Sequence, residues 1–235
     1  MDLSYPSHRS SLSYDNRRPV SHHDDAPRIE QRVALAGAWV LPEQAARLAA
    51  YLDVLRKWNQ KSNLTAFELN PPSEAAIDRL IVEPVVASNR LLPADRLLID
   101  IGSGGGSPAI PLRLMATQLR VVLVEARTRK SAFLREVVRQ LGLEGTTVEN
   151  CRFEELAGRS ELQGKADVVT MRAVRIGSEF WVNTRNVLRQ GGRLLLFGTA
   201  EDMERLSLPP DIERLFSDPL LTSNRSHLVG LQRKN

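Results

Sequence analysis

The fold class is indicated most clearly by a short apolar run that ends in a glycine-rich loop. Residues 97–112 read LLIDIGSGGGSPAIPL. The run Leu97–Ile101 predicts a buried strand, and Ser107-Pro108 predicts the start of a helix, because proline fits the first helical turn. Glycines between a strand and a helix let the backbone turn sharply and approach a ligand closely. The stretch therefore predicts a ligand-binding turn in an α/β fold.

Predicted strands and helices alternate after this loop. Apolar residues recur every three or four positions in Thr128–Leu141 and Ser178–Leu188, which predicts helices there. Further strands are expected at Arg120–Glu125, Thr146–Asn150, Asp167–Met171, Arg193–Phe197, Ile212–Phe216 and His227–Gln232. Such alternation predicts an α/β fold with a mostly parallel sheet, helices on both faces and right-handed crossovers.

The chain divides into three expected parts. Residues 1–28 are rich in Ser, Pro, Arg and His and have no apolar period, so they are expected to form a disordered leader. Residues 29–94 are expected to form an N-terminal helical extension. Its second helix has Ser73 as a candidate N-cap and contains Pro84, which should kink or split it. Residues 95–235 are expected to form the main domain.

Composition narrows the class of protein. The chain has 235 residues, of which 42% are hydrophobic and 26% charged, as in soluble globular proteins. One cysteine excludes a disulfide framework and a cysteine-cluster metal site. No apolar run approaches the roughly 18 residues of a membrane span, and none resembles a signal-peptide core. We therefore expect a cytoplasmic protein with no membrane anchor and no metal.

Positive charge is concentrated in one part of the sequence. Lysine and arginine number 32 and aspartate and glutamate 28, but Leu112–Gln140 alone holds seven bases and two acids. Such a surface attracts nucleic acid, because each neutralised phosphate releases counterions. A solvated helix face without a ligand is the alternative, and charge alone leaves both open.

The spacing of the glycines favours one cofactor over others. The dinucleotide fingerprint G-x-G-x-x-G would need glycine at position 107, where this chain has Ser107, and the sequence contains no G-x-x-x-x-G-K-[ST] phosphate loop. The remaining form, G-x-G-x-G at Gly102, Gly104 and Gly106, suits S-adenosylmethionine better. A purely structural turn is the alternative.

Other polar residues follow the predicted strands at positions suited to this cofactor. Glu125 ends the second strand, where a carboxylate can accept hydrogen bonds from both ribose hydroxyls of an adenosine. Phe153 and Glu154 follow the third strand, where the adenine would lie. Asp100, near the end of the first strand, is a candidate for contact with the methionine ammonium.

Several separated segments share their residues and their order with one family. They are LIDIGSGGGSPAIPL (98–112), WNQKSNLT (58–65), RKSAFL (129–134), RFEE (152–155) and MRA (171–173). Together they resemble the RsmG (GidB) family, the bacterial 16S rRNA guanine-N7 methyltransferases. The resemblance covers about residues 50–232.

The resemblance implies a fold, a reaction and a set of site residues. It implies a Rossmann-like, mostly parallel seven-stranded methyltransferase sheet with an N-terminal helical extension. It implies methylation by S-adenosylmethionine of a guanine N7 in 16S rRNA, in the 530 loop at position 527 of the family's substrate. Gly102 and Ser107 would line the cofactor site, Phe153 and Glu154 would flank the adenine, and Arg172 would belong to the cofactor and catalytic pocket.

The sequence departs from the family pattern near the expected substrate. The family usually has a bulky residue where Ser107 stands and glycine where Ala109 stands. Its H..DS segment appears here as Leu80-Ile-Val-Glu83-Pro84, without the histidine and the serine. These departures bear on substrate handling more than on cofactor binding.

The reaction explains why no catalytic dyad is visible. Guanine N7 already has an exposed lone pair, so the enzyme needs chiefly to hold the two reactants in attack geometry. We expect a monomer whose partner is 16S rRNA or the small ribosomal subunit, with Arg127, Arg129 and Lys130 as RNA contacts. The alternatives are a methyltransferase of the same fold with another RNA or a small-molecule substrate, and a non-catalytic RNA-binding ribosome-assembly factor.

Overall fold

Seven strands form one mixed sheet in the order β3-β2-β1-β4-β5-β7-β6. The computed structural model describes residues 25–173, 176–221 and 225–234. Strands β1 to β5 are parallel, and β7 runs antiparallel to both β5 and β6. The expected mostly parallel sheet is confirmed. The strands are β1 Leu97–Ile101, β2 Arg120–Val124, β3 Thr146–Glu149, β4 Ala166–Arg172, β5 Leu188–Thr199, β6 Ile212–Pro219 and β7 Ser226–Arg233.

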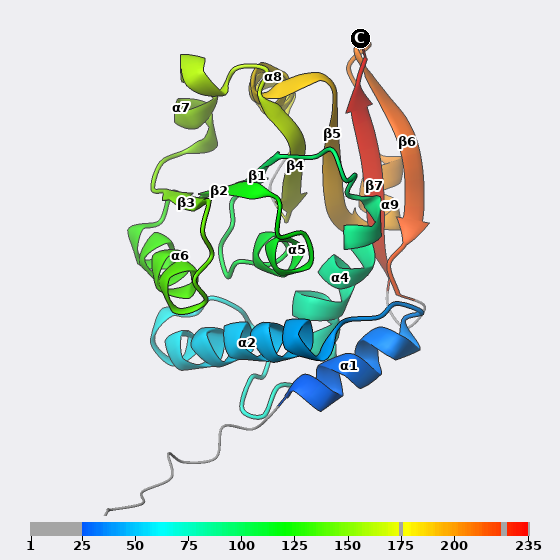
Figure 1. The fold of residues 1–235 in the computed structure, drawn as a ribbon. Coiled ribbons are helices and arrows are strands. Elements are labelled where there is room, and N and C mark those ends of the chain that lie inside the picture. Colours follow the sequence, from blue (N-terminus) through cyan, green and yellow to red (C-terminus); the bar gives the residue numbers. More distant parts are fainter. Residues whose placement is uncertain (1–24, 174–175, 222–224, 235) are drawn as a thin grey trace, which may run out of the picture.

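Helices cover both faces of this sheet (Figure 1). Helices α7 (Phe153–Ala157) and α8 (Ser178–Val187) pack on one face, and α5 (Ala109–Met115) and α6 (Thr128–Gln140) pack on the other. Beneath α5 and α6, α1 (Ala26–Leu35) and α2 (Pro42–Ser62) form a further layer. The short helix α9 (Ala200–Glu204) follows β5, and a 3-10 turn spans Ser160–Leu162. No helix in the described ranges is both long and apolar enough to cross a membrane.

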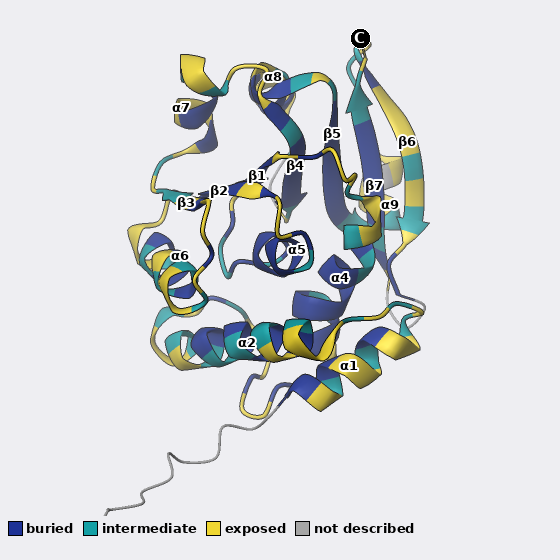
Figure 2. Ribbon diagram, viewed as in Figure 1, coloured by how far each residue is buried: buried dark blue, intermediate teal, exposed yellow. Residues whose placement is uncertain are grey.

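Side chains of the strands alternate between two hydrophobic clusters. Leu98 and Val168 pack in the cluster that contains the helices α1 to α6, whereas Ile99 and Val169 pack in the cluster of α7 and α8. This follows from the two-residue period of a strand. Figure 2 shows β7 buried for most of its length and β6, the outer edge strand, largely exposed. The helices before β1 thus share one core with the sheet.

The first helix begins earlier than expected from the sequence. Residues 26–28 belong to α1, although they were expected to be part of a disordered leader. Asp25 precedes the helix and is only 2% exposed, because it forms ion pairs with Arg28 and with Arg56 of α2. The remainder of the expected leader, residues 1–24, lies outside the described residues.

Pro84 divides the second helical region, as expected. The chain forms α3 (Glu74–Ile77), a π-helix (Asp78–Val82), α4 (Glu83–Ala87) and a 3-10 turn (Ser88–Arg90). Ser73 caps α3 by accepting a hydrogen bond from the amide of Ala76 at 3.2 Å. In the π-helix the amide of Glu83 donates to the carbonyl of Asp78, five residues earlier. In that register Pro84 would be the donor to the carbonyl of Arg79, but proline has no N–H.

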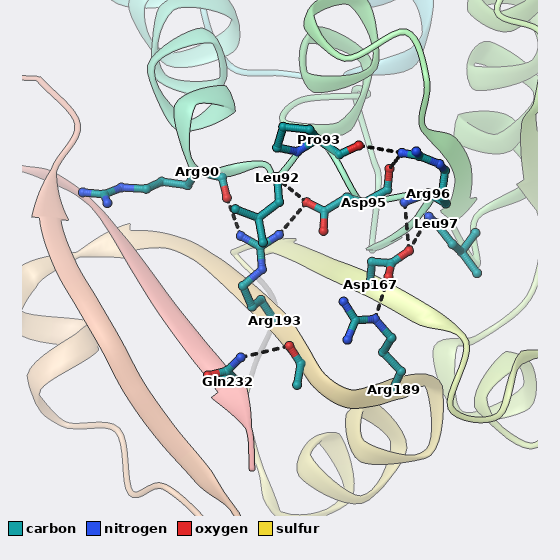
Figure 3. A network of polar contacts seen from close by, with 11 residues as sticks. Arg90, Leu92, Pro93, Asp95, Arg96, Leu97, Asp167, Arg189, Arg193 and Gln232 are labelled. Carbon is teal, nitrogen blue, oxygen red and sulfur yellow. Dashed lines mark hydrogen bonds and ion pairs between the residues drawn. The ribbon is translucent and has the colours of Figure 1, made fainter. Parts of the chain in front are cut away.

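A buried polar network holds the amino ends of the central strands (Figure 3). Asp95 is fully buried before β1, and its Oδ2 accepts hydrogen bonds from Arg193 Nη2 at 2.5 Å and from the amide of Leu92 at 2.7 Å. The Arg193 guanidinium also donates to the carbonyl of Arg90. Nearby, Asp167 of β4 accepts from the amide of Leu97 at 2.9 Å. The network ties β1, β4 and β5 together at the end opposite the glycine loop.

We expect Asp95→Ala to destabilise the protein by about 3–5 kcal/mol, because it leaves the buried Arg193 guanidinium without its carboxylate. The double variant Asp95→Leu/Arg193→Met removes both charges and should cost less than the single substitution. Asp218→Ala, which breaks a half-exposed pair with Arg90, is the matched control and should cost under about 1 kcal/mol. Urea denaturation measures all three. Equal losses for Asp95→Ala and Asp218→Ala would contradict the assigned role.

Candidate active site

A cavity of about 540 Å³ opens at the carboxyl ends of β1 and β2, beside α7 and the start of α8. Ligands of open α/β sheets bind at this edge. Five of the expected site residues line it, namely Gly102, Glu125, Arg127, Phe153 and Glu154. Further lining residues are Ile101, Val124, Ala126, Cys151, Arg152, Gly177, Glu179 and Phe180.

The Glu125 carboxylate connects the two loops that border this cavity. Glu125 is 7% exposed, and its Oε2 accepts a hydrogen bond from the amide of Gly104 at 3.0 Å. Its Oε1 accepts from the amide of Arg127 at 2.8 Å. A carboxylate has about four acceptor positions, so two remain for hydroxyl donors of a ligand. The same side chain therefore shapes the glycine loop and keeps two acceptor positions for a ligand.

The apolar wall of the cavity comes from α7, α8 and the loop before α7. Phe153 and Phe180 are both 7% exposed and belong to the cluster on this face of the sheet. Cys151 lies beside them, and burial raises the pKa of its thiol, which keeps it protonated and apolar in character. Sequence reasoning missed Gly177, Glu179 and Phe180. The spacing of apolar residues predicts helix α8, but it does not indicate beside which distant loop that helix packs.

The cavity does not include the other five residues expected at the cofactor site, nor Arg129 and Lys130. Gly104, Gly106, Ser107, Asp100 and Arg172 are absent from its lining. Asp100 follows Ile99 in β1 and therefore points to the other face of the sheet, where Thr170 Oγ1 donates to its Oδ1 at 2.6 Å. It is 1% exposed, so it lies beneath the glycine loop and not in the cavity.

The glycine loop rests on helix α2 of the N-terminal extension. The Tyr51 hydroxyl donates to the carbonyl of Gly105 at 2.6 Å. Gly106 has φ +90°, and a Cβ there would lie 2.9 Å from Ile110 Cγ1 and 3.4 Å from the Tyr51 ring. A side chain is thus excluded at Gly106 both by backbone strain and by packing. At Gly104 a Cβ would meet only ordinary contacts, so its φ of +50° alone disfavours other residues.

Arg172 is held in a buried network beside this loop. Its Nη2 lies 3.0 Å from Glu83 Oε2, and its Nη1 donates to the carbonyl of Arg79 at 2.5 Å. The guanidinium lies 4.7 Å from the centre of the Phe197 ring, and its Nη1 lies 3.4 Å from Ser107 Oγ. Burial lowers the pKa of Arg172 to about 10, so it stays charged at neutral pH. These contacts make it a residue that supports the loop from the face opposite the cavity.

Glu83 is the centre of that network. It is fully buried, and besides Arg172 it binds Arg79 Nη1 at 2.9 Å and accepts from Ser226 Oγ at 2.5 Å. Arg79 Nη1 also donates to Ser226 Oγ at 2.8 Å. Glu83 stands in the segment where the sequence departs from the family's H..DS pattern. The Glu83 carboxylate therefore has Arg79, Arg172 and Ser226 as side-chain partners, although positions 80 and 84 of this segment lack the family's histidine and serine.

Of the three basic residues expected to contact RNA, Arg127 lines the cavity, and Arg129 and Lys130 follow it in the first turn of α6. Arg127 and Arg129 are exposed and Lys130 is half-buried. Arg129 Nε donates to Ser62 Oγ of α2 at 3.0 Å. Lys130 Nζ lies 3.8 Å from the position of a Cβ built on Gly104. In the described ranges no three His, Cys, Asp or Glu side chains lie close enough together to hold a metal ion.

We expect ionisation of Asp100 to weaken the fold as the pH rises. Burial raises the pKa of Asp100 from 3.8 to about 6, so between these values the folded protein binds more protons than the unfolded chain. The free energy of unfolding contributed by Asp100 therefore falls from about pH 4 to pH 6. Asp100→Asn removes this effect, and its stability relative to wild type should rise over that range. Urea denaturation at pH 4 and pH 7 measures the free energy of unfolding of both proteins. The same difference between variant and wild type at both pH values would contradict the expectation.

Comparison with known proteins identifies the family of this chain. The family model GidB, described as rRNA small subunit methyltransferase G, matches residues 44–210. Ribosomal RNA small subunit methyltransferase G from Dichelobacter nodosus is 37% identical, covering 75% of this chain and 81% of its own. The protein of that name from Syntrophotalea carbinolica is 30% identical over 88% of this chain and 97% of its own.

Solved structures match the fold at low sequence identity. A SAM-dependent methyltransferase from Aquifex aeolicus superimposes with a TM-score of 0.53 at 13% identity, covering 77% of this chain and 98% of its own. TrmN from Thermus thermophilus gives a TM-score of 0.50 at 15% identity, covering 65% of this chain and 48% of its own. The family resemblance inferred from the motifs is confirmed: this chain belongs to the rRNA small subunit methyltransferase G (GidB) family of S-adenosylmethionine-dependent enzymes.

Proposed function

We propose that this chain methylates N7 of a guanine in 16S rRNA, with S-adenosylmethionine bound in the cavity beside Glu125. The observation that carries the proposal is the Glu125 carboxylate. It is fixed by the amides of Gly104 and Arg127 and borders a cavity at the carboxyl edge of the sheet. At about 540 Å³ the cavity is within the range of small-molecule sites, which runs from about 300 to 1,000 Å³.

The lining residues suit the parts of this cofactor. Glu125 is suited to accept hydrogen bonds from the ribose hydroxyls. Phe153 and Phe180 supply aromatic rings for the adenine, with Glu154 beside them as an acceptor for its amino group. Gly102 leaves room for close approach of the backbone. We propose that the main domain supplies these contacts and that the N-terminal extension supports the glycine loop through Tyr51.

The cofactor supplies a methyl group on a positively charged sulfur, and the protein supplies position. Guanine N7 attacks with its own lone pair, so no residue has to remove a proton first. In-line attack requires the two reactants to be held close and aligned, an effect worth up to about 7–11 kcal/mol. Arg172 acts as a positioning residue in this proposal, because it supports Ser107 and the segment of Arg79 from beneath the loop.

The RNA is proposed to approach over the basic residues at the start of α6. Arg127, Arg129 and Lys130 are the candidates, because guanidinium and ammonium groups bind phosphates and release counterions. The substrate implies that the protein acts in the cytoplasm, where small ribosomal subunits are assembled.

The reaction is tested by mapping N7-methylguanine in small-subunit rRNA after incubation with the protein and S-adenosylmethionine. Methylation at a single guanine is the expected result. Cofactor binding without transfer to rRNA would indicate a different substrate. Rejection of the cofactor together with retained RNA binding would indicate a non-catalytic assembly factor. Either result would contradict the proposal.

Glu125→Gln should weaken S-adenosylmethionine binding by about 10- to 100-fold. The substitution keeps the shape of the side chain, but it replaces an acceptor oxygen by an NH₂ group and removes the charge that strengthens the remaining hydrogen bonds. Glu144→Gln makes the same change at an exposed position outside the cavity and serves as the control. Calorimetric titration gives both dissociation constants. Equal dissociation constants for Glu125→Gln and Glu144→Gln would contradict the assignment of Glu125 to the cofactor site.

Replacing Arg127, Arg129 and Lys130 together by glutamine should weaken rRNA binding at all sequences. Each phosphate contact that is lost should reduce the slope of log K against log salt by about one. The expected change is therefore between one and three, measured by filter binding at several salt concentrations. An unchanged slope would assign the three side chains to a solvated face without a ligand.

A further inference from the structure

A second cavity of about 490 Å³ lies at the same edge of the sheet, at the ends of β5 and β7. Thr199, the last residue of β5, and Ser226, the first of β7, form a pair across the two strands and both line it. The opposite wall comes from α1, the loop after α2, α3 and the π-helix, including Arg32, Phe67 and Arg79. Figure 1 shows α1 and α4 near the lower end of β7. This cavity is therefore built where the N-terminal extension meets the sheet.

The two cavities are separate but neighbouring. In the described residues no side chain lines both of them. The Glu83 network lies between them. Two of its members, Arg79 and Ser226, line the second cavity. A third member, Arg172, also binds Glu83 and contacts Ser107 in the glycine loop. A small molecule in one cavity would not fill the other. A polymer lying along the edge of the sheet could occupy both.

Two of the three arginines that line the second cavity, Arg79 and Arg225, form no ion pair with the carboxylates of its lining. Its two carboxylates, Glu74 and Asp78, are both bound by Arg32, at 2.8 Å and 2.5 Å, and the hydrogen bond to Asp78 raises the pKa of Arg32. These three groups together carry one net negative charge, so Arg32 does not serve as an anion-binding group. Arg79 shares the single buried carboxylate of Glu83 with a second guanidinium, so the network keeps a surplus positive charge.

The two remaining guanidiniums can reach a ligand. The Arg79 side chain is 28% exposed, and its contacts with the described residues use only Nη1, so its other N–H groups are available to an anion. The Arg225 side chain is 85% exposed and lies 3.6 Å from Glu201 Oε1, a loose surface pair. Surface pairs of this kind contribute little and exchange readily with a phosphate.

An aromatic ring stands beside these cations. Phe67 lines the cavity and is half-buried against the hydrophobic core, which holds it in place. Proteins bind single-stranded RNA by stacking bases on aromatic rings while cationic groups bind the phosphates. Cations with an adjacent aromatic ring therefore match a nucleotide better than a free inorganic anion, which has no use for the ring.

We propose that the second cavity binds a nucleotide of the substrate RNA that flanks the target guanine, with its phosphate at Arg79 and Arg225 and its base at Phe67. The proposal rests on the proposed rRNA methyltransferase activity and names where that enzyme holds its substrate. The target guanine itself has to lie at the cofactor cavity, so the second cavity takes a neighbour.

Two variants test the phosphate and the base contacts separately. Arg225→Gln should raise the KM for small-subunit rRNA and reduce the salt slope of RNA binding by about one. Phe67→Leu should raise the KM about 5- to 100-fold, as expected for the loss of one base-stacking contact, and should leave the salt slope unchanged. In both variants the dissociation constant for S-adenosylmethionine should equal that of wild type. Arg120→Gln, an exposed arginine at the amino end of β2, is the control of equal charge change.

Phe67→Tyr separates the loss of stacking from a loss of packing. It keeps the ring and should retain a KM close to wild type, whereas a merely structural role for Phe67 would show as reduced thermal stability with unchanged KM in Phe67→Leu. KM values and salt slopes equal to those of Arg120→Gln in both Arg225→Gln and Phe67→Leu would overturn the second cavity and leave the proposed function standing.

Failure of the proposed function has a different signature. It would appear as no methylation of rRNA by the wild-type protein. The second cavity is then judged by direct rRNA binding of the same variants. Affinity equal to wild type in Arg225→Gln and Phe67→Leu overturns it, and a loss confined to these two and absent from Arg120→Gln supports it.

Discussion

The buried carboxylate of Glu83 is the interaction on which the arrangement of this protein most depends. An isolated ionised carboxylate in a protein interior costs several kcal/mol, so it is tolerated only with strong partners. Here two guanidiniums, Arg79 and Arg172, and the Ser226 hydroxyl supply them. These partners come from the π-helix, β4 and β7. One carboxylate therefore joins the N-terminal extension to the end of the sheet where both cavities lie. A shift of any of these segments would take a partner away from this buried charge.

Pro84 contributes to this network through the backbone. Because it lacks an N–H, it cannot donate to the carbonyl of Arg79 in the π-helical register that precedes it. That carbonyl accepts a hydrogen bond from Arg172 instead. The irregularity in the helix thus leaves a backbone carbonyl that binds the Arg172 side chain. Glu83 and Pro84 act together, since Glu83 supplies the charge and Pro84, where the sequence departs from the family pattern, leaves the carbonyl of Arg79 free. The departure from the family pattern at Pro84 therefore has a structural role.

The alternation of side chains along the strands separates support from binding. On one face Asp100, Thr170 and Arg172 lie beneath the glycine loop with Tyr51, covered by the N-terminal extension. The proposed cofactor cavity opens toward the other face, where α7 and α8 form its apolar wall. Polar side chains at the ends of parallel strands can therefore serve one site in two ways. Some line the proposed cofactor cavity, and others hold the glycine loop beside it.

Local sequence was sufficient for the order of elements and for part of the site. The run Leu97–Ile101, the glycines after it and Glu125 could be placed because strand period, turn chemistry and position at a strand end are local properties. The mostly parallel sheet followed from the same alternation and from the family resemblance. Only the tertiary structure decided that Asp100 and Arg172 lie under the loop, that Phe180 completes the cavity, and that Arg225 and Phe67 share a second one. Those facts depend on contacts between segments far apart in the chain, and the packing that creates them leaves no periodic signal in the sequence.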